Sequence, residues 1–181
     1  MNEPPDYCPR CGTELEPLDP PSSTYCRACD APVFYNPIPT ARLAILDGDA
    51  VLLVRVDAPG DPMWGTPGGM VEPGEDPDEA GARELREETT LSVDSNDMVL
   101  FDARTFAKFG RVQKTSLAYA VDAADVRGDP RAADEVTDVK YWTPAELDAA
   151  PDRLLTSWPD AHRDLRWWVE NARRALACHD S

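Results

Sequence analysis

The sequence predicts an α/β (α+β) sandwich in which a mixed sheet lies between helices, with a small cysteine-rich module before it and a helix after it. Three observations support this fold class. Apolar runs of strand length alternate with a few helical segments along the 181-residue chain. Four of the five cysteines crowd the N-terminal region, and the C-terminal region carries an apolar stripe at helical spacing. We therefore expect three parts, residues 1–35, 36–150 and 151–181.

The four N-terminal cysteines form two Cys-x-x-Cys pairs. Four thiolates at this spacing are typical of one tetrahedral zinc ion, and a module of about 30 residues is too small to build much of a core without one. Two disulfides or a redox-active pair are the alternatives, but no secretory signal and no strand–helix context accompanies either pair. We predict a zinc ribbon, and Cys178 is interpreted as a packed or idle cysteine. The expected zinc ligands are Cys8, Cys11, Cys26 and Cys29.

The expected sheet begins with a hairpin. Two apolar runs, residues 41–46 and 50–56, flank the turn sequence Asp-Gly-Asp. A short proline-bearing linker, Asn36–Thr40, precedes the hairpin, and a turn-rich loop at residues 58–69 follows it. The pattern predicts further strands at residues 98–102, 115–121 and 136–142.

Three helices are expected. Asp76 has the features of an N-cap, with Glu79 in the capping-box position, and this helix should run to about Thr89. Thr143 caps a second helix in the same way. The apolar stripe predicts a third helix over residues 159–177.

The net charge of the chain disfavours some classes of partner. Acidic residues outnumber basic ones by 34 to 18, which gives a formal net charge of −16, and only three of the basic residues are lysines. A surface this negative repels nucleic acid and anionic membranes, so neither is an expected partner. Scattered carboxylates with few lysines also suit a very salty cytoplasm, where counterions screen the repulsion. We expect a halophilic, cytoplasmic protein without a membrane segment, because the longest apolar run, residues 50–54, is far too short to span one.

Three glutamates, Glu84, Glu87 and Glu88, lie within one turn of the first expected helix. Their spacing places them on one face, while Leu85 and Thr89 fall on the side that faces the core. In so acidic a chain, the default interpretation of such a cluster is a solvated surface. Carboxylates on a rigid helix also suit Mg²⁺ or Mn²⁺, because these hard cations prefer oxygen ligands. The cluster by itself leaves both interpretations open.

A longer pattern around the cluster favours the metal site. It reads Gly-x5-Glu-x7-Arg-Glu-Leu-x-Glu-Glu and closes on a leucine, and it resembles the 23-residue signature box of the Nudix hydrolases at every specified position but one. Residues 63–69 (MWGTPGG) resemble the segment that leads into that box. Thr90 stands where the family has glycine, so the helix must end differently here or Thr90 must be strained. The matching positions are Gly69, Glu75, Arg83, Glu84, Leu85, Glu87, Glu88 and Leu91.

The resemblance implies a Mg²⁺- or Mn²⁺-dependent enzyme that hydrolyses the diphosphate of a nucleoside diphosphate linked to another group and releases a nucleoside monophosphate. Glu84, Glu87 and Glu88 would be metal ligands, one of them polarising the attacking water. The backbone carbonyl of Gly69 would complete the metal's coordination sphere. Metal ions would also explain how so negative a protein binds so negative a substrate, because they neutralise the diphosphate and generate the nucleophile.

Further site residues follow from the same resemblance. Arg83 and Glu75 would form a pair that connects the loop to the helix, and the alternative is a surface ion pair of little energetic worth. Many Nudix enzymes also use a later glutamate on a loop. Glu135 is our candidate for it, with a solvated loop residue as the alternative.

A zinc ribbon ahead of a Nudix domain is similar to the layout of the NADH pyrophosphatases. That subgroup carries a Trp- and Pro-rich motif after the box, and residues 101–120 lack it. ADP-ribose-like, NADH-like and nucleotide-sugar substrates therefore all stay open. The alternative from another class is a non-catalytic nucleotide sensor whose ribbon is an interaction module, although such sensors typically lose the box carboxylates that this chain keeps. The ribbon could equally be a structural support or a homodimer contact.

Overall fold

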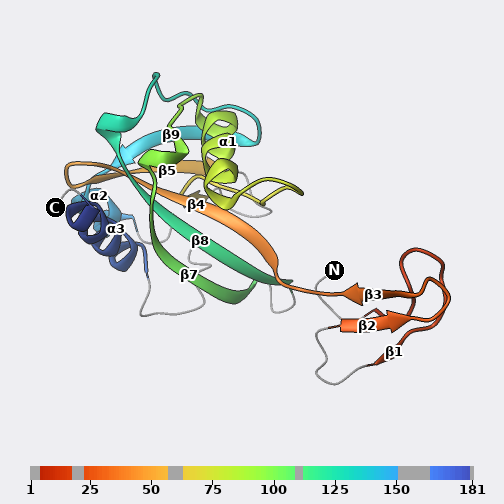
Figure 1. The fold of residues 1–181 in the computed structure, drawn as a ribbon. Coiled ribbons are helices and arrows are strands. Elements are labelled where there is room, and N and C mark those ends of the chain that lie inside the picture. The colour runs from red at the N-terminus through yellow and green to blue at the C-terminus, as the bar shows by residue number, and fades with distance from the viewer. Residues whose placement is uncertain (1–4, 18–22, 57–62, 109–111, 151–163, 180–181) are drawn as a thin grey trace. The chain divides into compact units, whose positions relative to one another are not determined.

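The computed structural model describes residues 5–17, 23–56, 63–108, 112–150 and 164–179. The chain divides into two compact units (Figure 1). The first comprises Met1–Ile38 and Thr105–Thr115, and the second comprises Pro39–Arg104 and Ser116–Ser181. Within the described ranges, no helix has the length and apolar character needed to cross a membrane.

The N-terminal unit contains a three-stranded antiparallel sheet, β1 (Glu16–Pro17), β2 (Ser23–Cys26) and β3 (Ala31–Phe34), in the order β1-β2-β3. Its buried core is small and half of it is sulfur-bearing. So small a core adds little stability, which is why such modules depend on a metal. The buried residues of this core are Cys8, Leu15, Cys26 and Val33.

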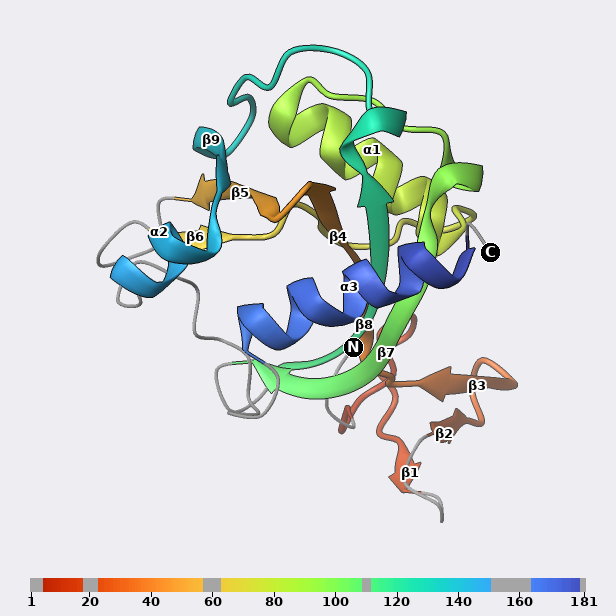
Figure 2. The same ribbon diagram turned by 90° about the vertical axis from the view of Figure 1, so that its left-hand side faces the viewer.

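The larger sheet, most of which belongs to the second unit, is mixed and has the order β6-β5-β4-β8-β7, with β9 pairing β5 (Figures 1 and 2). β4 and β5 form the predicted hairpin, joined through Gly48, whose φ of 59° suits glycine. The strands are β4 (Ile38–Asp47), β5 (Ala50–Val56), β6 (Met63–Gly65), β7 (Val99–Lys108), β8 (Val112–Asp122) and β9 (Val136–Trp142).

Helices pack on both faces of this sheet. They are α1 (Pro77–Thr89), α2 (Pro144–Ala149) and α3 (Leu165–His179). Alternate residues of β4 point to opposite faces, so Leu43 packs in one core cluster with Leu85 of α1, and Leu46 packs in the other with Trp168 of α3. Figure 2 shows α1 and α3 separated by the sheet. The predicted sandwich, with a mixed sheet between helices, is confirmed.

The helices begin and end close to their predicted positions. α1 starts after Asp76 and ends at Thr89, and α2 starts after Thr143, whose hydroxyl and Glu146 form the expected capping box. α3 begins, in the described residues, at Leu165; the predicted start at residue 159 lies outside them. Thr90 adopts the left-handed region with φ 61°, so the strained alternative holds.

Four strands differ from the prediction. β6 lies inside the predicted turn-rich loop and pairs with β5, and β4 begins within the predicted linker Asn36–Thr40. β7 and β8 are longer than expected, because cross-strand polar contacts extend them beyond their apolar residues. The hydroxyls of Thr105 and Thr115, for example, lie 2.9 Å apart in hydrogen-bonding contact.

Candidate active site

A backbone segment leading into α1 is held against β4. The N–H groups of Leu43 and Ala41 donate to the carbonyls of Pro67 and Gly69, each at 3.0 Å. This pairing continues the sheet at the point where β5 no longer contacts β4. It places Gly68 and Gly69 at a defined position beside the glutamate-bearing face of α1.

Gly68 is needed for this close approach, and Gly69 lies against a neighbouring side chain. Gly68 has a φ of 130°, and a Cβ added there would collide with the carbonyl oxygen of Ala41. A Cβ on Gly69 would collide with the carboxylate of Glu84. The backbone of the Gly68–Gly69 turn therefore lies in direct contact with one of the predicted metal ligands.

Glu88 is the most buried of the three clustered glutamates. It is 7% exposed and accepts a 2.9 Å hydrogen bond from the N–H of Gly68. Burial raises the pKa of Glu88 to about 7, although the Gly68 bond and the charge of Arg42 act in the opposite direction. The nearby carboxylates of Glu84 and Glu135 raise its pKa further.

Arg83 holds the remaining carboxylates. Its guanidinium donates to Glu75 at 2.8 and 3.1 Å, and to Glu84 and Glu87 at 2.9 Å each. These pairings raise the pKa of Arg83, with Glu75 as the largest cause, and lower that of Glu75. The Arg83 and Glu75 side chains are only 19% and 17% exposed, which distinguishes this pair from an ordinary surface ion pair. Burial raises the pKa of Glu84, and Arg83 opposes that shift.

Glu135 lies near the same carboxylates. It follows Asp134, which has a φ of 49°, and the N–H of Ala133 donates to the backbone carbonyl of Glu88 at 3.0 Å. The charge of Glu135 raises the pKa of both Glu84 and Glu88. The fold thus brings together four carboxylates that are separated by up to 51 positions, from Glu84 to Glu135.

The carboxylates of this site are not gathered around one point. In the described part of the chain, the four cysteines are the only group of three or more His, Cys, Asp or Glu side chains placed to hold a metal ion. Arg83 binds Glu84 and Glu87, while Glu88 faces Gly68. The donor set still fits a hard divalent cation, because it is rich in carboxylates and repulsive without a positive charge. Arg83 binds one oxygen of Glu84 and one of Glu87, so these side chains would have to move for the carboxylates to meet at one ion.

The carbonyl oxygen of Gly69 already accepts a hydrogen bond from Ala41. A carbonyl has two lone pairs, so one acceptor position is left for a metal ion.

Arg42 is a residue of this site that the sequence analysis did not identify. It is partly buried on β4 and donates to the carbonyl of Gly68 at 3.1 Å. Burial lowers its pKa, and the charges of Glu88 and Glu84 act against that shift. An arginine within the apolar run of β4 was the available signal, because a charged side chain in a strand core requires a partner.

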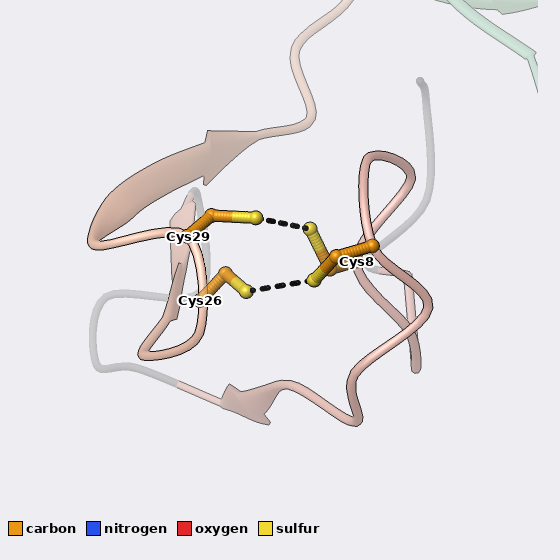
Figure 3. Close-up of side chains that lie close together, drawn as sticks. Cys8, Cys26 and Cys29 are labelled. Carbon is orange, nitrogen blue, oxygen red and sulfur yellow. Dashed lines mark hydrogen bonds between the residues drawn. The ribbon is translucent and has the colours of Figure 1, made fainter.

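The four N-terminal sulfurs form a compact cluster within the first unit. Their Sγ atoms all lie within 4.8 Å of one another, with Cys8–Cys29 at 3.9 Å and Cys11–Cys26 at 3.5 Å (Figure 3). Tetrahedral zinc with Zn–S bonds of about 2.3 Å separates its sulfurs by about 3.8 Å, so the cluster fits such an ion. Cys8, Cys11, Cys26 and Cys29 form no disulfide in this structure, which excludes the two-disulfide alternative here.

The cysteine thiols also differ in acidity. Hydrogen bonding with Thr13 lowers the pKa of Cys11 to about 6, whereas hydrogen bonding with Cys11 raises the pKa of Cys29 to about 12. Four thiolates packed this closely repel one another, and a bound cation removes that repulsion. The cluster is consistent with the predicted zinc ribbon.

A match to a protein-family model identifies the family of this chain. The model described as NUDIX domain matches residues 37–165, which cover α1, its glutamates and Glu135. The chain belongs to the Nudix hydrolase family. The resemblance of the signature box and the family match therefore agree.

Curated relatives in this family include an NAD-capped RNA hydrolase NudC from Pseudomonas fluorescens. It is 31% identical to this Nudix chain over 87 residues. The match covers 48% of this chain and 32% of the relative, so the chain matches about a third of that protein's length.

Solved structures show the same fold. A NUDIX hydrolase from Nitrosomonas europaea superimposes with a TM-score of 0.64 and 18% identity, covering 94% of this chain and 93% of that one. A bifunctional NMN adenylyltransferase/ADP ribose pyrophosphatase from Francisella tularensis, solved with AMP and a manganese ion, has a TM-score of 0.57 and 23% identity. That match covers 77% of this chain and 43% of the other.

Proposed function

We propose that this Nudix hydrolase cleaves the diphosphate bond of a nucleoside diphosphate linked to another group, such as ADP-ribose, NADH or a nucleotide sugar. Water adds to one phosphorus, the bridging P–O bond breaks, and the products are a nucleoside monophosphate and the phosphorylated second group. One observation carries the proposal. Glu84, Glu88 and Glu135 are crowded beside the Gly68–Gly69 turn, and their burial and mutual repulsion raise the pKa of Glu88 to about 7.

Divalent cations relieve this crowding. We assign Glu84, Glu87 and Glu88, with the carbonyl of Gly69, as ligands for Mg²⁺ or Mn²⁺. When bound, such an ion neutralises the diphosphate and acidifies water, which is the chemistry that an anionic substrate requires. The protein's own carboxylates then accept the proton of the attacking water, and Glu135 assists from its loop.

Arg83 has a supporting role. Its contacts with Glu75, Glu84 and Glu87 hold the cluster together when no metal is bound. We propose that metal binding releases Glu84 and Glu87 while the Arg83–Glu75 pair stays in place and keeps α1 aligned with the preceding loop.

The four-cysteine cluster has a separate role in the proposal. We assign it to a structural Zn²⁺ ion, because zinc favours four thiolates in tetrahedral geometry. The active site does not use this ion. The large negative charge of the chain makes a polynucleotide an unfavourable substrate, although the NudC relatives are named for NAD-capped RNA.

The test is a substrate screen with Mg²⁺ and Mn²⁺ that includes ADP-ribose, NADH, NAD-capped RNA, dinucleoside polyphosphates and nucleoside triphosphates. On the best substrate, Glu87→Gln and Glu88→Gln should each lower kcat about a hundredfold or more, with a smaller effect on KM, because each removes a charge that acts in the transition state. Glu135→Gln should lower kcat by a smaller factor.

Glu170→Gln is the matched control, since Glu170 is exposed on α3 and away from the cluster. It should keep full activity. Equal rates for the wild type and Glu87→Gln, or no EDTA-sensitive turnover of any diphosphate, would contradict the proposal and favour the non-catalytic sensor.

A further inference from the structure

Thr90 adopts a backbone conformation that its own side chain disfavours. It follows the last residue of α1 with φ 61° and ψ 3°, in the left-handed region. A non-glycine residue in this region carries an energetic cost and persists only where its surroundings hold it. Glycine would avoid this cost. The contacts of Thr90 must therefore account for its presence.

Residues 127–135 run along the C-terminal end of α1. Backbone hydrogen bonds join this segment to the helix and to the residues just after it, so the segment satisfies carbonyls that a helix end leaves without partners. The pairs are Arg131 N–H with Thr89 O (2.9 Å), Ala133 N–H with Glu88 O (3.0 Å), and Ser92 with Arg127 in both directions (3.0 and 2.9 Å).

One further bond in this contact comes from a side chain. The hydroxyl of Thr90 donates to the carbonyl of Asp129 at 3.0 Å. The neighbouring backbone lies close as well, because a Cβ added to Gly128 would be 3.2 Å from the carbonyl oxygen of Thr90. The backbone bonds would form with almost any sequence, whereas this one requires a hydroxyl at position 90.

The segment ends at Glu135. Ala133 is bonded to the carbonyl of Glu88, so a shift of the segment along α1 changes where Glu135 lies relative to the other carboxylates. We propose that Thr90 is a positioning residue: its hydroxyl holds the 127–135 segment on α1 and thereby sets the position of Glu135 at the active site. This inference rests on the proposed function, in which Glu135 assists hydrolysis.

The kinetic test compares three substitutions of Thr90. Thr90→Val keeps the shape but removes the hydroxyl, and it should lower kcat about threefold to tenfold, the value of one hydrogen bond, with little change in KM. Thr90→Ser should retain wild-type kcat. Thr90→Gly should lower kcat as Thr90→Val does, yet leave the thermal midpoint equal to or above that of the wild type, because it relieves the strain. A purely structural role would instead make kcat follow the midpoint across the three variants, and that result would overturn the inference.

A double-mutant cycle identifies the group through which Thr90 acts. In a Glu135→Gln background, Thr90→Val should cause less than about a twofold further loss, because the residue that it positions is already disabled. Full additivity of the two losses, or no loss from Glu135→Gln alone, would overturn the inference. Thr105→Val, which removes an exposed hydroxyl on β7 outside the active site, is the matched control and should keep the wild-type kcat.

Amide hydrogen exchange tests the same contact without turnover. Thr90→Val should speed exchange at the N–H groups of Arg131 and Ala133 by about threefold or more, and Thr90→Ser should not. Unchanged exchange in Thr90→Val would overturn the inference even if the wild type is active. Faster exchange in Thr90→Val, combined with a wild type that hydrolyses none of the substrates, would instead place the failure in the proposed function.

Discussion

Burial changes the acidity of Glu88 within the signature box. Glu88 is 7% exposed and has a pKa of about 7, whereas the side chain of Glu87, one residue earlier, is 41% exposed and pairs with Arg83. The two residues are of the same type, and only their environments differ. Glu88 can accept a proton near neutral pH because it is buried, whereas Glu87 is exposed and contacts the guanidinium of Arg83.

This difference predicts a pH dependence of stability in the metal-free protein. The pKa of Glu88 is about 7 in the folded state against an ordinary value of 4.5, so the folded state binds more protons between these values. The free energy of unfolding must then fall as pH rises through this window. Glu88→Gln removes this contribution, and its stability relative to the wild type should increase by about 2–3 kcal/mol from pH 5 to pH 8.

Thermal or urea unfolding of EDTA-treated protein at several pH values measures this difference. Glu170→Gln should show the same pH dependence as the wild type, because that residue is exposed. Parallel pH profiles for the wild type and Glu88→Gln would show that Glu88 titrates normally in the fold.

The signature box could be read from the sequence residue by residue, but the surroundings of each residue could not. Arg42 is separated from Glu88 by 46 positions, and only the pairing of β4 with the Gly68–Gly69 turn brings it close. The contacts of Thr90 could not be predicted for the same reason. Its strain can be inferred from the box, whereas its bond to Asp129 depends on a loop that folds back onto α1.

At the scale of elements, local signals predicted the helices well. α1 begins after Asp76 and α2 after Thr143, because a capping box is complete within four residues. The strands were harder to predict. β6 has three residues and exists only because β5 offers it a partner, and no periodicity can appear over so short a run.

The ribbon is the element whose folding should depend on one ion. Elemental analysis should find about one zinc per chain, and Cys26→Ser should lose that zinc and unfold the ribbon, because Cys26 is fully buried in a core that has little else. Most of the sandwich should persist. Circular dichroism and limited proteolysis of the N-terminal segment would follow the change.

Cys178→Ser is the matched control, since this exposed thiol on α3 is outside the cluster. It should keep the wild-type zinc content. Purified protein without zinc and with an intact ribbon would contradict the assignment of the cluster as a zinc site.

For the whole molecule, net charge is the dominant property. A formal charge of −16 on 181 residues creates repulsion that favours expansion of the chain. Salt shortens the Debye length from about 10 Å at 0.1 M to about 3 Å at 1 M, so it removes most of this repulsion between exposed groups.

We therefore predict that the thermal midpoint rises strongly from about 0.1 M to about 1 M KCl and levels off once screening is complete. A neutral osmolyte at matched osmolality should raise the midpoint less, which separates screening from general exclusion effects. A midpoint independent of KCl would mean that the acidic surface has a cause other than adaptation to salt.

The sequence by itself determined the composition of the two proposed metal sites, the helix that carries the box and the fold class, because these depend on spacing within short stretches. The Gly-x5-Glu-x7-Arg-Glu pattern and two Cys-x-x-Cys pairs are complete within their own segments. Tertiary structure decided how acidic each carboxyl is, which backbone contacts Glu84, and how Thr90 and Glu135 are connected. Those properties arise from burial and from contacts between segments distant along the chain, where electrostatic and hydrogen-bond energies depend on distances that spacing in sequence does not set.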